Sequence, residues 1–397
     1  MKPALHIVIY SELRLYGGGR ETWLAYFLPT LAARRVFRDI FVHCMRSDAP
    51  EDTLPHRWNA PGGTPVSFLP STRSLYGPGG APRRFAAFAR GVRAGLNANA
   101  RAADLLLAIG VHGEAPASLL GALEGLIRRR QLRLVTWVRE ASVRMIGARR
   151  GKLVEAGFGL LQRALLHASA RIVTNGADTL ALYRELFPEL QDRLVNVPNA
   201  VDAARFQVVS DPEWSARPLR VGYLGRFLRE KGFLDLLAAA ARCLDETGLE
   251  FSAWGHRLDA DGVPPVPPPN LALNPPAPQE RVFEALAQCH VLLFLNRTPW
   301  TAGLSHALLE ALAAGRPIVA WDVPCHSQVI DHENGFLVAE GDLAGLTRAL
   351  RSLLTEPESS LRARSEAARR TASAYSPEAH VERFLTEVAT PLLDERG

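Results

Sequence analysis

The sequence is poor in the features that indicate a secreted or membrane-spanning protein. It holds only four cysteines, and they form no CxxC pair: Cys44, Cys243, Cys289 and Cys325. Neither a disulfide framework nor a zinc site is indicated, so we expect small core residues in a reducing compartment. No apolar run approaches the roughly 20 residues that a membrane-spanning helix needs. Because Glu12 and Arg14 break the first apolar run, we interpret it as a strand rather than a signal peptide and expect a cytoplasmic protein.

Charge is unevenly divided between the two halves of the chain. Residues 1–200 hold 27 Lys and Arg against 15 Asp and Glu, and residues 201–397 hold the remaining 19 against 26. Solvated helix faces would explain the basic first half, and so would a surface drawn to anionic lipid or to an anionic substrate. Nucleic acid is disfavoured as a partner, because the arginine clusters lack interleaved aromatic residues and no binding motif surrounds them.

Short apolar runs alternate with longer amphipathic stretches along the whole chain, a pattern typical of parallel sheets with helices on both faces. Nine runs are predicted to be strands: HIVIY, DIFVHC, DLLLAIG, RLVTWV, ARIVTN, LRVGYLG, LEFSAWG, HVLLFL and PIVAWD. Nine strands are more than one sheet of this kind usually holds, and the pattern restarts at Leu219. We therefore expect two doubly wound, Rossmann-like α/β domains. In such sheets ligands bind at the carboxyl ends of the strands.

Three stretches are predicted to be irregular. Residues 196–218 contain turn residues and little periodicity, and we expect the inter-domain linker there. Residues 59–84 are rich in glycine and proline and long enough to form a functional or mobile loop. Residues 262–278 hold eight prolines. They favour a stiff surface connection over a polyproline ligand for a partner.

A phosphate site is indicated by GRFLREKG, residues 225–232, which follows a predicted strand. Arg226 offers a planar fork of donors and Lys231 a point charge, the two usual ways to hold a diphosphate. The flanking glycines allow the backbone to approach a ligand closely. An ordinary surface ion pair with Glu230 would explain this stretch equally well.

The stretch TAGLSHALLEALAAGRPIVAWD, residues 301–322, favours the phosphate site. Its glycine and serine precede a helical run, Gly315 ends that run, and the next strand follows. The free N–H groups near Ser305, His306 and Ala307 would form an anion site at the helix N-terminus. Glu310, one turn into the helix, can reach the ribose hydroxyls of a nucleotide.

Together with VPNAVDAARF upstream, these two stretches resemble glycosyltransferase family 4, a large GT-B family of nucleotide-sugar-dependent transferases. GGGRE, residues 17–21, resembles its glycine loop, and YSPEAHVERFLTEV, from Tyr375, resembles its closing helix. The resemblance implies an acceptor-binding domain over 1–200, a donor-binding domain over 201–377, and a C-terminal helix, 378–397, that joins the first domain.

The resemblance also implies the roles of the site residues. Arg226 and Lys231 neutralise the donor diphosphate, Glu310 binds ribose, and backbone N–H groups at 304–307 support the leaving phosphate. The other donor-binding candidates are Gly17, Gly18, Gly19, His256, Asn274, Gly303, Leu304, Ser305, His306 and Ala307. The implied reaction retains the anomeric configuration without a protein nucleophile, and the phosphate oxygen that departs accepts the acceptor's proton.

No metal cofactor is expected, because the two cations replace one. The DxD pattern in DADG, residues 259–262, is interpreted as a plain turn. The expected partners are a nucleotide sugar, a saccharide or lipid-linked acceptor and, through the basic first domain, an anionic membrane surface.

Two positions depart from the family pattern. Ala302 stands where the family carries a second glutamate, and Arg139 stands where it carries a histidine near the sugar's O6. Two hypotheses about the sugar follow: it lacks the usual hydroxyls, as a 6-deoxy sugar does, or it carries a carboxylate that Arg139 binds bidentately. Loss of catalysis and a different alignment of this loop also stay open. We count Arg139, Arg226 and Lys231 as the candidate catalytic residues.

The leading hypothesis is a metal-independent, retaining glycosyltransferase in cell-surface polysaccharide, lipopolysaccharide or glycolipid synthesis, located in the cytoplasm or on the inner face of the membrane. The alternative is an inactive donor-binding or scaffold protein of the same fold. In the first domain, Glu12, Glu114 and Glu140 are the carboxylates near enough in principle to replace the missing glutamate. His112, just past a buried strand, is a candidate lining residue of the cleft.

Overall fold

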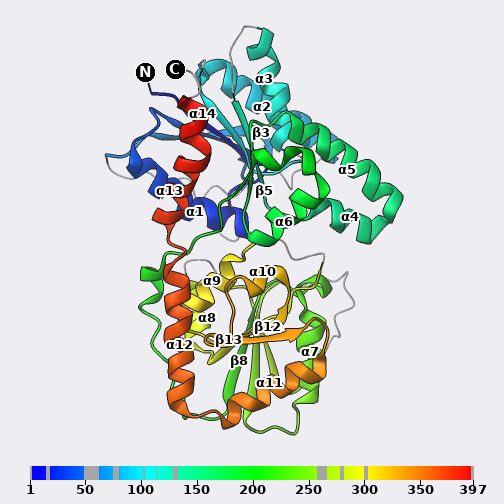
Figure 1. Cartoon of the computed structure of the whole chain (residues 1–397), viewed down its shortest axis with the longest axis vertical. Coiled ribbons are helices and arrows are strands. Elements are labelled where there is room, and N and C mark those ends of the chain that lie inside the picture. Colours follow the sequence, from blue (N-terminus) through cyan, green and yellow to red (C-terminus); the bar gives the residue numbers. More distant parts are fainter. Residues whose placement is uncertain are drawn as a thin grey trace. The chain divides into compact units, whose positions relative to one another are not determined.

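The computed structural model describes residues 2–14, 18–48, 62–74, 80–101, 103–112, 114–127, 133–256, 266–277, 281–298 and 303–394. The chain divides into two compact units. The first unit comprises Met1–Pro198 and Pro377–Gly397, and the second comprises Asn199–Ser376. Figure 1 shows a sheet covered by helices in each of them.

The sheet of the first unit has seven parallel strands in the order β3-β2-β1-β4-β5-β6-β7. The strands are β1 (Leu5–Val8), β2 (Ile40–Arg46), β3 (Val66–Ser74), β4 (Leu105–Ala108), β5 (Arg133–Val138), β6 (Arg171–Thr174) and β7 (Leu194–Asn196). Strand β1 pairs with β2 on one side and with β4 on the other, so the strand order reverses between β1 and β4. Ligands of doubly wound sheets bind at this reversal point, beyond the carboxyl ends of the strands.

Helices cover both faces of this sheet. They are α1 (Gly19–Arg34), α2 (Ala81–Asn99), α3 (Glu114–Ile127), α4 (Ser142–Arg150), α5 (Lys152–His167), α6 (Ala177–Leu186), α13 (Pro377–Phe384) and α14 (Thr390–Asp394). Short turns of 3₁₀ helix over Pro188–Arg193 and of π-helix over Leu385–Ala389 complete the unit. Helix α13 packs against α1 through a buried aromatic cluster of Trp23, Phe27, Trp137 and Phe384. The C-terminal helices are therefore part of the core of the first unit.

The sheet of the second unit has six parallel strands in the order β10-β9-β8-β11-β12-β13. The strands are β8 (Leu219–Leu224), β9 (Leu249–Trp254), β10 (Leu271–Asn274), β11 (Val291–Phe294), β12 (Ile318–Asp322) and β13 (Gly335–Ala339). The helices are α7 (Phe233–Arg242), α8 (Val282–Ala287), α9 (His306–Ala313), α10 (Pro324–Ser327), α11 (Leu343–Thr355) and α12 (Glu358–Ser373), with 3₁₀ turns at Ala203–Phe206 and Arg229–Lys231. The strand order reverses between β8 and β11.

The predicted fold class of two doubly wound α/β sheets is confirmed, and so are the nine predicted strands. They are β1, β2, β4, β5, β6, β8, β9, β11 and β12. The prediction of one irregular loop over 59–84 is wrong, because Val66–Ser74 forms β3 and α2 begins at Ala81. Pro70 is tolerated because β3 is an edge strand. Within 262–278, the segment Leu271–Asn274 likewise forms the edge strand β10.

The predicted linker over 196–218 is also wrong in extent, because most of this segment packs inside the second unit. The side chains of Phe206 and Trp214 are buried there. The Val201 N–H donates to the Tyr375 carbonyl (2.8 Å), and the Arg316 guanidinium donates to the Ser210 carbonyl (2.8 Å). These buried contacts hold in place a segment whose sequence shows no regular periodicity.

Among the helices of the described residues, none has both the length and the apolar character that crossing a bilayer requires.

Candidate functional site

The predicted phosphate loop, residues 225–232, joins β8 to α7. Its apolar residues Phe227 and Leu228 are buried, and the Phe227 ring stacks on Phe233 with ring centroids 4.3 Å apart. Arg226, directly before Phe227, is exposed, and Lys231, three residues after Leu228, is half-buried. The loop is therefore fixed by its apolar side chains, while both predicted diphosphate ligands reach the surface.

A single buried phenol ties the two ends of this loop together. The Tyr223 hydroxyl lies 3.0 Å from the carbonyl oxygen of Arg226 and 3.0 Å from that of Lys231. Burial raises the pKa of Tyr223, against the opposing effect of Arg226, so the hydroxyl keeps its proton and donates. The backbones of the two predicted diphosphate ligands are thus brought to one point.

Backbone hydrogen bonds join this loop to the ends of the neighbouring strands. The Gly225 N–H donates to the Trp254 carbonyl (3.0 Å), the Phe227 N–H to the His256 carbonyl (3.0 Å), and the Gly255 N–H to the Asn274 carbonyl (3.3 Å). These bonds place His256 and Asn274 on the same sheet edge as the phosphate loop. Three stretches that the sequence analysis selected separately therefore meet.

On the other side, the loop is fixed to the end of β11. The Arg297 N–H donates to the Glu230 carbonyl (3.2 Å), and the Arg297 guanidinium makes two bonds to Asp235, of 2.8 and 2.7 Å. The Trp321 indole N–H donates to the same carboxylate (3.2 Å). Asp235 therefore connects the first turn of α7 to the strands beside it, an interaction that the sequence analysis missed.

Gly232 is required by this close approach. Its φ is 75°, and a Cβ at this position would lie 2.0 Å from the Leu295 carbonyl oxygen. We expect Gly232→Ala to lower the free energy of unfolding of the second unit by about 3 kcal/mol or more, since strain in the left-handed region adds to a backbone clash.

Urea unfolding followed by the fluorescence of Trp214, Trp254 and Trp321 measures this loss. Gly225→Ala is the matched control in the same loop, because its Cβ would come no nearer than 3.4 Å, to the Tyr223 hydroxyl. It is expected to cost less than about 1 kcal/mol. Equal losses for the two variants would contradict the argument.

The second predicted anion-binding element is the start of α9, the first helix after β11. Ser305 is its N-cap residue and makes no side-chain cap hydrogen bond, and Gly303 has a φ of 73°. Two contacts from the beginning of the unit hold this start: Asn199 donates to the Leu304 carbonyl (2.6 Å), and the His306 Nδ1–H donates to the Ala200 carbonyl (3.0 Å). The His306 side chain is thus a structural anchor.

The two elements lie at the ends of adjacent strands. Strands β8 and β11 pair in parallel through Val221↔Val291 and Leu293↔Tyr223, so both end at the same edge, at the reversal of strand order. This is the position at which doubly wound sheets bind their ligands. Glu310 lies on α9, one turn after its start, and is nearly fully buried.

In the first unit, the predicted glycine loop leads into α1. Gly17 lies outside the described residues, whereas Gly18 and Gly19 are exposed, with a φ of 115° at Gly18. Ala302, in the second unit, also lies outside the described residues. Arg139, after β5, donates to the Gly19 carbonyl (3.2 Å) and lies over the Trp23 ring, 5.3 Å from its centroid. Burial lowers the pKa of Arg139 to about 9, with Arg20 contributing in the same direction.

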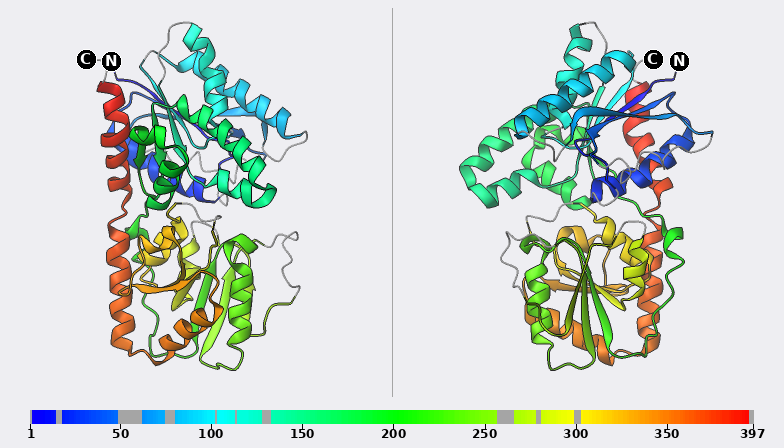
Figure 2. Two further views of the ribbon diagram at one scale, coloured as in Figure 1. Left: turned by 45° about the vertical axis from the view of Figure 1, so that its right-hand side comes forward. Right: turned by 180° about the vertical axis from the view of Figure 1, so that it is seen from behind.

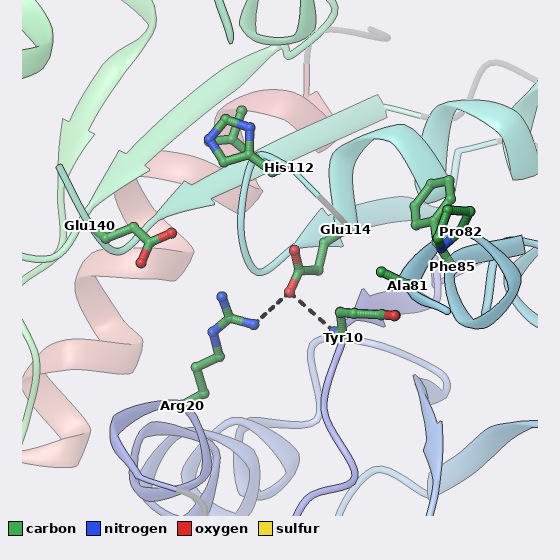
Figure 3. Close-up of a pocket in the computed structure, with 9 residues that line it drawn as sticks. Tyr10, Arg20, Ala81, Pro82, Phe85, His112, Glu114 and Glu140 are labelled. Atoms are coloured by element: carbon green, nitrogen blue, oxygen red, sulfur yellow. Dashed lines mark hydrogen bonds and ion pairs between the residues drawn. The ribbon is translucent and has the colours of Figure 1, made fainter. Parts of the chain in front are cut away.

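A cavity of about 510 Å³ lies at the carboxyl ends of β1, β4 and β5 of the first unit (Figure 3). Its lining is Tyr10, Arg20, Ala81, Pro82, Phe85, Val111, His112, Glu114 and Glu140. It combines charged groups with the apolar side chains at the beginning of α2. Such a mixture suits a saccharide, whose faces are apolar and whose edges carry hydroxyls.

The Glu114 carboxylate accepts two hydrogen bonds from residues that line this cavity. It accepts from the Arg20 guanidinium (2.8 Å) and from the Tyr10 N–H (3.1 Å), as the dashed lines of Figure 3 show. Burial raises the pKa of Glu114, and Arg20 opposes this rise. Burial also lowers the pKa of His112 to about 4, so this histidine is neutral near pH 7.

Sequence reasoning named Glu114, Glu140 and His112 only as nearby candidates and missed Arg20 and Tyr10. The available signal was that each of these residues lies at the end of a predicted strand, shortly after one, or in the first turn of the next helix. In the part of the chain that the structure describes, there is no group of three or more His, Cys, Asp or Glu side chains placed to hold a metal ion.

Comparison with solved structures identifies the fold. Two doubly wound parallel-sheet units match the structures of GT-B glycosyltransferases over nearly the whole chain, so the predicted GT-B fold is confirmed. Residues 218–356, which include the sheet of the second unit and α7 to α11, match the family model described as "Glycosyl transferases group 1".

A search of curated proteins finds relatives that match about half of the chain. Glycogen synthase from Mycobacterium tuberculosis is 30% identical over 224 residues, which are 52% of this chain and 50% of that protein. The chain thus spans about half the length of the curated relatives it matches.

Two solved structures illustrate the likeness in fold. Sucrose-phosphate synthase from Thermosynechococcus elongatus aligns at a TM-score of 0.74 and 15% identity, over 99% of this chain and 100% of that one. HepE from Anabaena in complex with UDP-glucose aligns at 0.70 and 15%, over 98% and 99%.

Proposed function

We propose that the protein is a retaining, metal-independent glycosyltransferase that moves a sugar from a nucleotide-sugar donor to a saccharide or lipid-linked acceptor. One observation carries the proposal. The Arg226–Lys231 loop and the start of α9 lie beyond the carboxyl ends of two adjacent strands, at the point where the strand order of the second sheet reverses. Both lie within the segment that matches the group 1 family model. Both elements supply the donors that a diphosphate requires.

The chemistry follows from where charge develops. As the glycosidic bond to the nucleotide breaks, negative charge collects on the leaving diphosphate. Arg226, Lys231 and the N–H groups that open α9 would stabilise it there, and a preorganised set of donors needs no rearrangement during the reaction. The leaving phosphate oxygen then takes the acceptor's proton on the same face, which gives retention. Glu310 would hold the ribose, and His256 and Asn274 would lie beside the nucleotide.

The acceptor would occupy the cavity of the first unit. Its Glu114 and Glu140 carboxylates can accept hydrogen bonds from sugar hydroxyls, and its Phe85 and Tyr10 rings can pack on a sugar face. Lipid-linked saccharides suit this assignment, and we place the reaction in cell-surface polysaccharide, lipopolysaccharide or glycolipid synthesis, at the cytoplasmic face of a membrane. A lipopolysaccharide outer core galactosyltransferase, WaaB, shares the fold at a TM-score of 0.65 and 13% identity.

The donor sugar is proposed to lack the usual hydroxyls, as a 6-deoxy sugar does, with an acidic sugar as the second candidate. The proposal rests on the residue types at Ala302 and Arg139. The Arg139 guanidinium already donates to Gly19 and lies over Trp23, which favours the 6-deoxy sugar because fewer of its donors are left to grip a carboxylate.

A panel of nucleotide sugars tests the function. Differential scanning fluorimetry with hexose, 6-deoxyhexose and uronic acid donors on several bases should show one that raises Tm, because a ligand that binds only the folded state stabilises it. The same donor should be hydrolysed slowly in the absence of acceptor. Binding without hydrolysis would indicate an inactive donor-binding protein. If no nucleotide or nucleotide sugar binds, both the transferase and the donor-binding protein are excluded.

A further inference from the structure

Helices α4 and α5 form a pair that projects from the first unit. Figures 1 and 2 show it standing out from the side of the sheet. The chain turns between the two helices at Gly151, whose φ is 87°. Helix α5 reaches the core through Leu166, which is buried, and through Phe158 and Leu165, which pack beside it. Among the other elements, α5 packs most extensively on α4.

The outer face of α5 is apolar. Its large side chains are strongly exposed: Leu153 by 89%, Leu160 by 64%, Leu161 by 53% and Val154 by 42%. Residues seven apart lie on one face of a helix, so Leu153 lies above Leu160 and Val154 above Leu161. Gly157 lies between the two pairs on the same face, Ala164 follows Leu161 on it, and both are exposed as well. Single exposed leucines need no explanation, whereas a contiguous apolar face indicates a contact with a partner.

A cluster of positive charge adjoins this face. Arg149, Arg150 and Lys152 surround the turn between the helices, and all three are exposed. The one acidic residue of α4 and α5 is Glu155, and it is bonded to Arg144 on the inner side (3.1 Å). Arg144 bonds in turn to Glu185 (2.6 Å). The outer face of the pair therefore offers cations and apolar side chains without a carboxylate.

An apolar face beside a basic cluster indicates which kind of partner binds there. A second copy of the chain would bring another apolar face together with a second set of cations, so like charges would meet beside a buried interface. An anionic bilayer supplies both requirements, since acyl chains accept the leucines and headgroup phosphates pair with the arginines. The apolar residues from Leu153 to Ala164 extend over about 16 Å of helix, long enough to lie in the interface plane.

We propose that α4 and α5, through the leucine face at 153–161 and the basic turn at 149–152, dock the protein on an anionic lipid surface. This deepens the membrane contact of the proposed function by naming its surface. It brings the first unit, which carries the cavity, onto the membrane where a lipid-linked acceptor would be held.

Co-sedimentation of the full chain with vesicles tests the proposal. The protein should pellet with vesicles of phosphatidylcholine mixed with phosphatidylglycerol, not with phosphatidylcholine alone, and high salt should release it. Arg149→Gln/Arg150→Gln should lower the partition coefficient about 25-fold, since each basic residue contributes about fivefold. Leu153→Ser/Leu160→Ser should lower it about tenfold or more.

Val208→Ser is the matched control, because Val208 is an apolar side chain of the second unit with 71% exposure. It should leave the partition coefficient unchanged, and none of the variants should change Tm, since all replace exposed side chains. Retained binding by both double variants would overturn the proposal. A dimer detected by light scattering would also overturn it if only Leu153→Ser/Leu160→Ser dissociates that dimer. In that case the apolar face would bind a second copy of the chain.

The outcome is separable from the proposed function. Nucleotide-sugar binding is measured in solution without vesicles and depends on the second unit. A protein that binds its donor but no vesicle refutes the lipid surface alone. A protein that binds vesicles but no donor refutes the transferase alone.

Discussion

Replacement of Lys231 by alanine is expected to lower kcat/KM for sugar transfer by about 100- to 1000-fold, and that of Arg226 by a similar factor. Both cations would face a diphosphate whose charge grows as the sugar leaves, so their contribution is larger in the transition state than in the donor complex. Donor affinity should fall less, by about tenfold each, because the bound diphosphate is already charged. Initial rates at varied donor concentration, together with calorimetric donor binding, separate the two effects.

The same loop offers a matched control. Arg229 carries the same charge three residues from Arg226, is exposed, and lies in the 3₁₀ turn of the loop. Arg229→Ala should change the rate by less than about threefold, as expected for a solvent-screened charge. Tm should stay the same in all three variants, since Phe227, Leu228 and the Tyr223 hydroxyl hold the loop through groups that remain. Equal rate losses for Arg229→Ala and Lys231→Ala would contradict the assignment of two placed donors.

The strands that the sequence predicted share a physical property. All nine lie inside a sheet, with a neighbour on each side, and strands buried on both faces produce continuous apolar runs. The four that were missed, β3, β7, β10 and β13, are the four edges of the two sheets. Pro70 within β3 and the prolines before β10 read as breakers, yet an edge strand tolerates proline because one side of its backbone makes no ladder.

The candidate site divides in the same manner. The phosphate loop and the start of α9 are each continuous in sequence, so their residue types and spacing were sufficient to select them. The cavity of the first unit joins Tyr10, Arg20, Glu114 and Glu140, which come from three different strand ends. Only the strand order β1-β4-β5 makes these ends neighbours. Arg297 and Asp235, 62 residues apart, were missed for the same reason.

Lowering the pH from 7 to 5 is expected to destabilise the first unit strongly, because it buries histidines in the neutral form. Burial lowers the pKa of His43 to about 3 and those of His112 and His380 to about 4, from an ordinary value of 6.5. In the unfolded chain these histidines are protonated below pH 6.5, whereas in the folded chain they stay neutral until the pH falls to about 4. The stabilisation is thus complete above pH 6.5 and is lost as the pH falls, at about 1.4 kcal/mol per pH unit for each histidine.

His380 shows why the charged form is excluded. Its Nε2 accepts from the Trp23 indole N–H (2.9 Å), and its Nδ1–H donates to the Pro198 carbonyl (2.5 Å). Only a neutral ring makes both bonds, since a protonated ring has no acceptor to offer Trp23. At pH 5 the three histidines together are expected to cost on the order of 6 kcal/mol, comparable to the whole stability of a domain.

His380→Gln isolates one of these contributions. A glutamine amide can accept from Trp23 and donate to Pro198 without titrating, so the variant should be less stable at pH 7.5 but lose stability more slowly in acid. Its slope between pH 6.5 and 5 should be shallower by about 1.4 kcal/mol per pH unit. Urea unfolding followed by the fluorescence of Trp23 and Trp137 measures it.

The comparison of the two proteins cancels other titrating groups. Glu21 and Glu114, whose pKa values burial raises, bind protons more readily in the folded chain and oppose the histidines, but they are present in both proteins. His332→Gln, at an exposed histidine of the second unit, should leave the slope unchanged. If His380→Gln retains the full slope, the ring of His380 takes up its proton in the folded chain, and the bond to Trp23 does not hold it neutral.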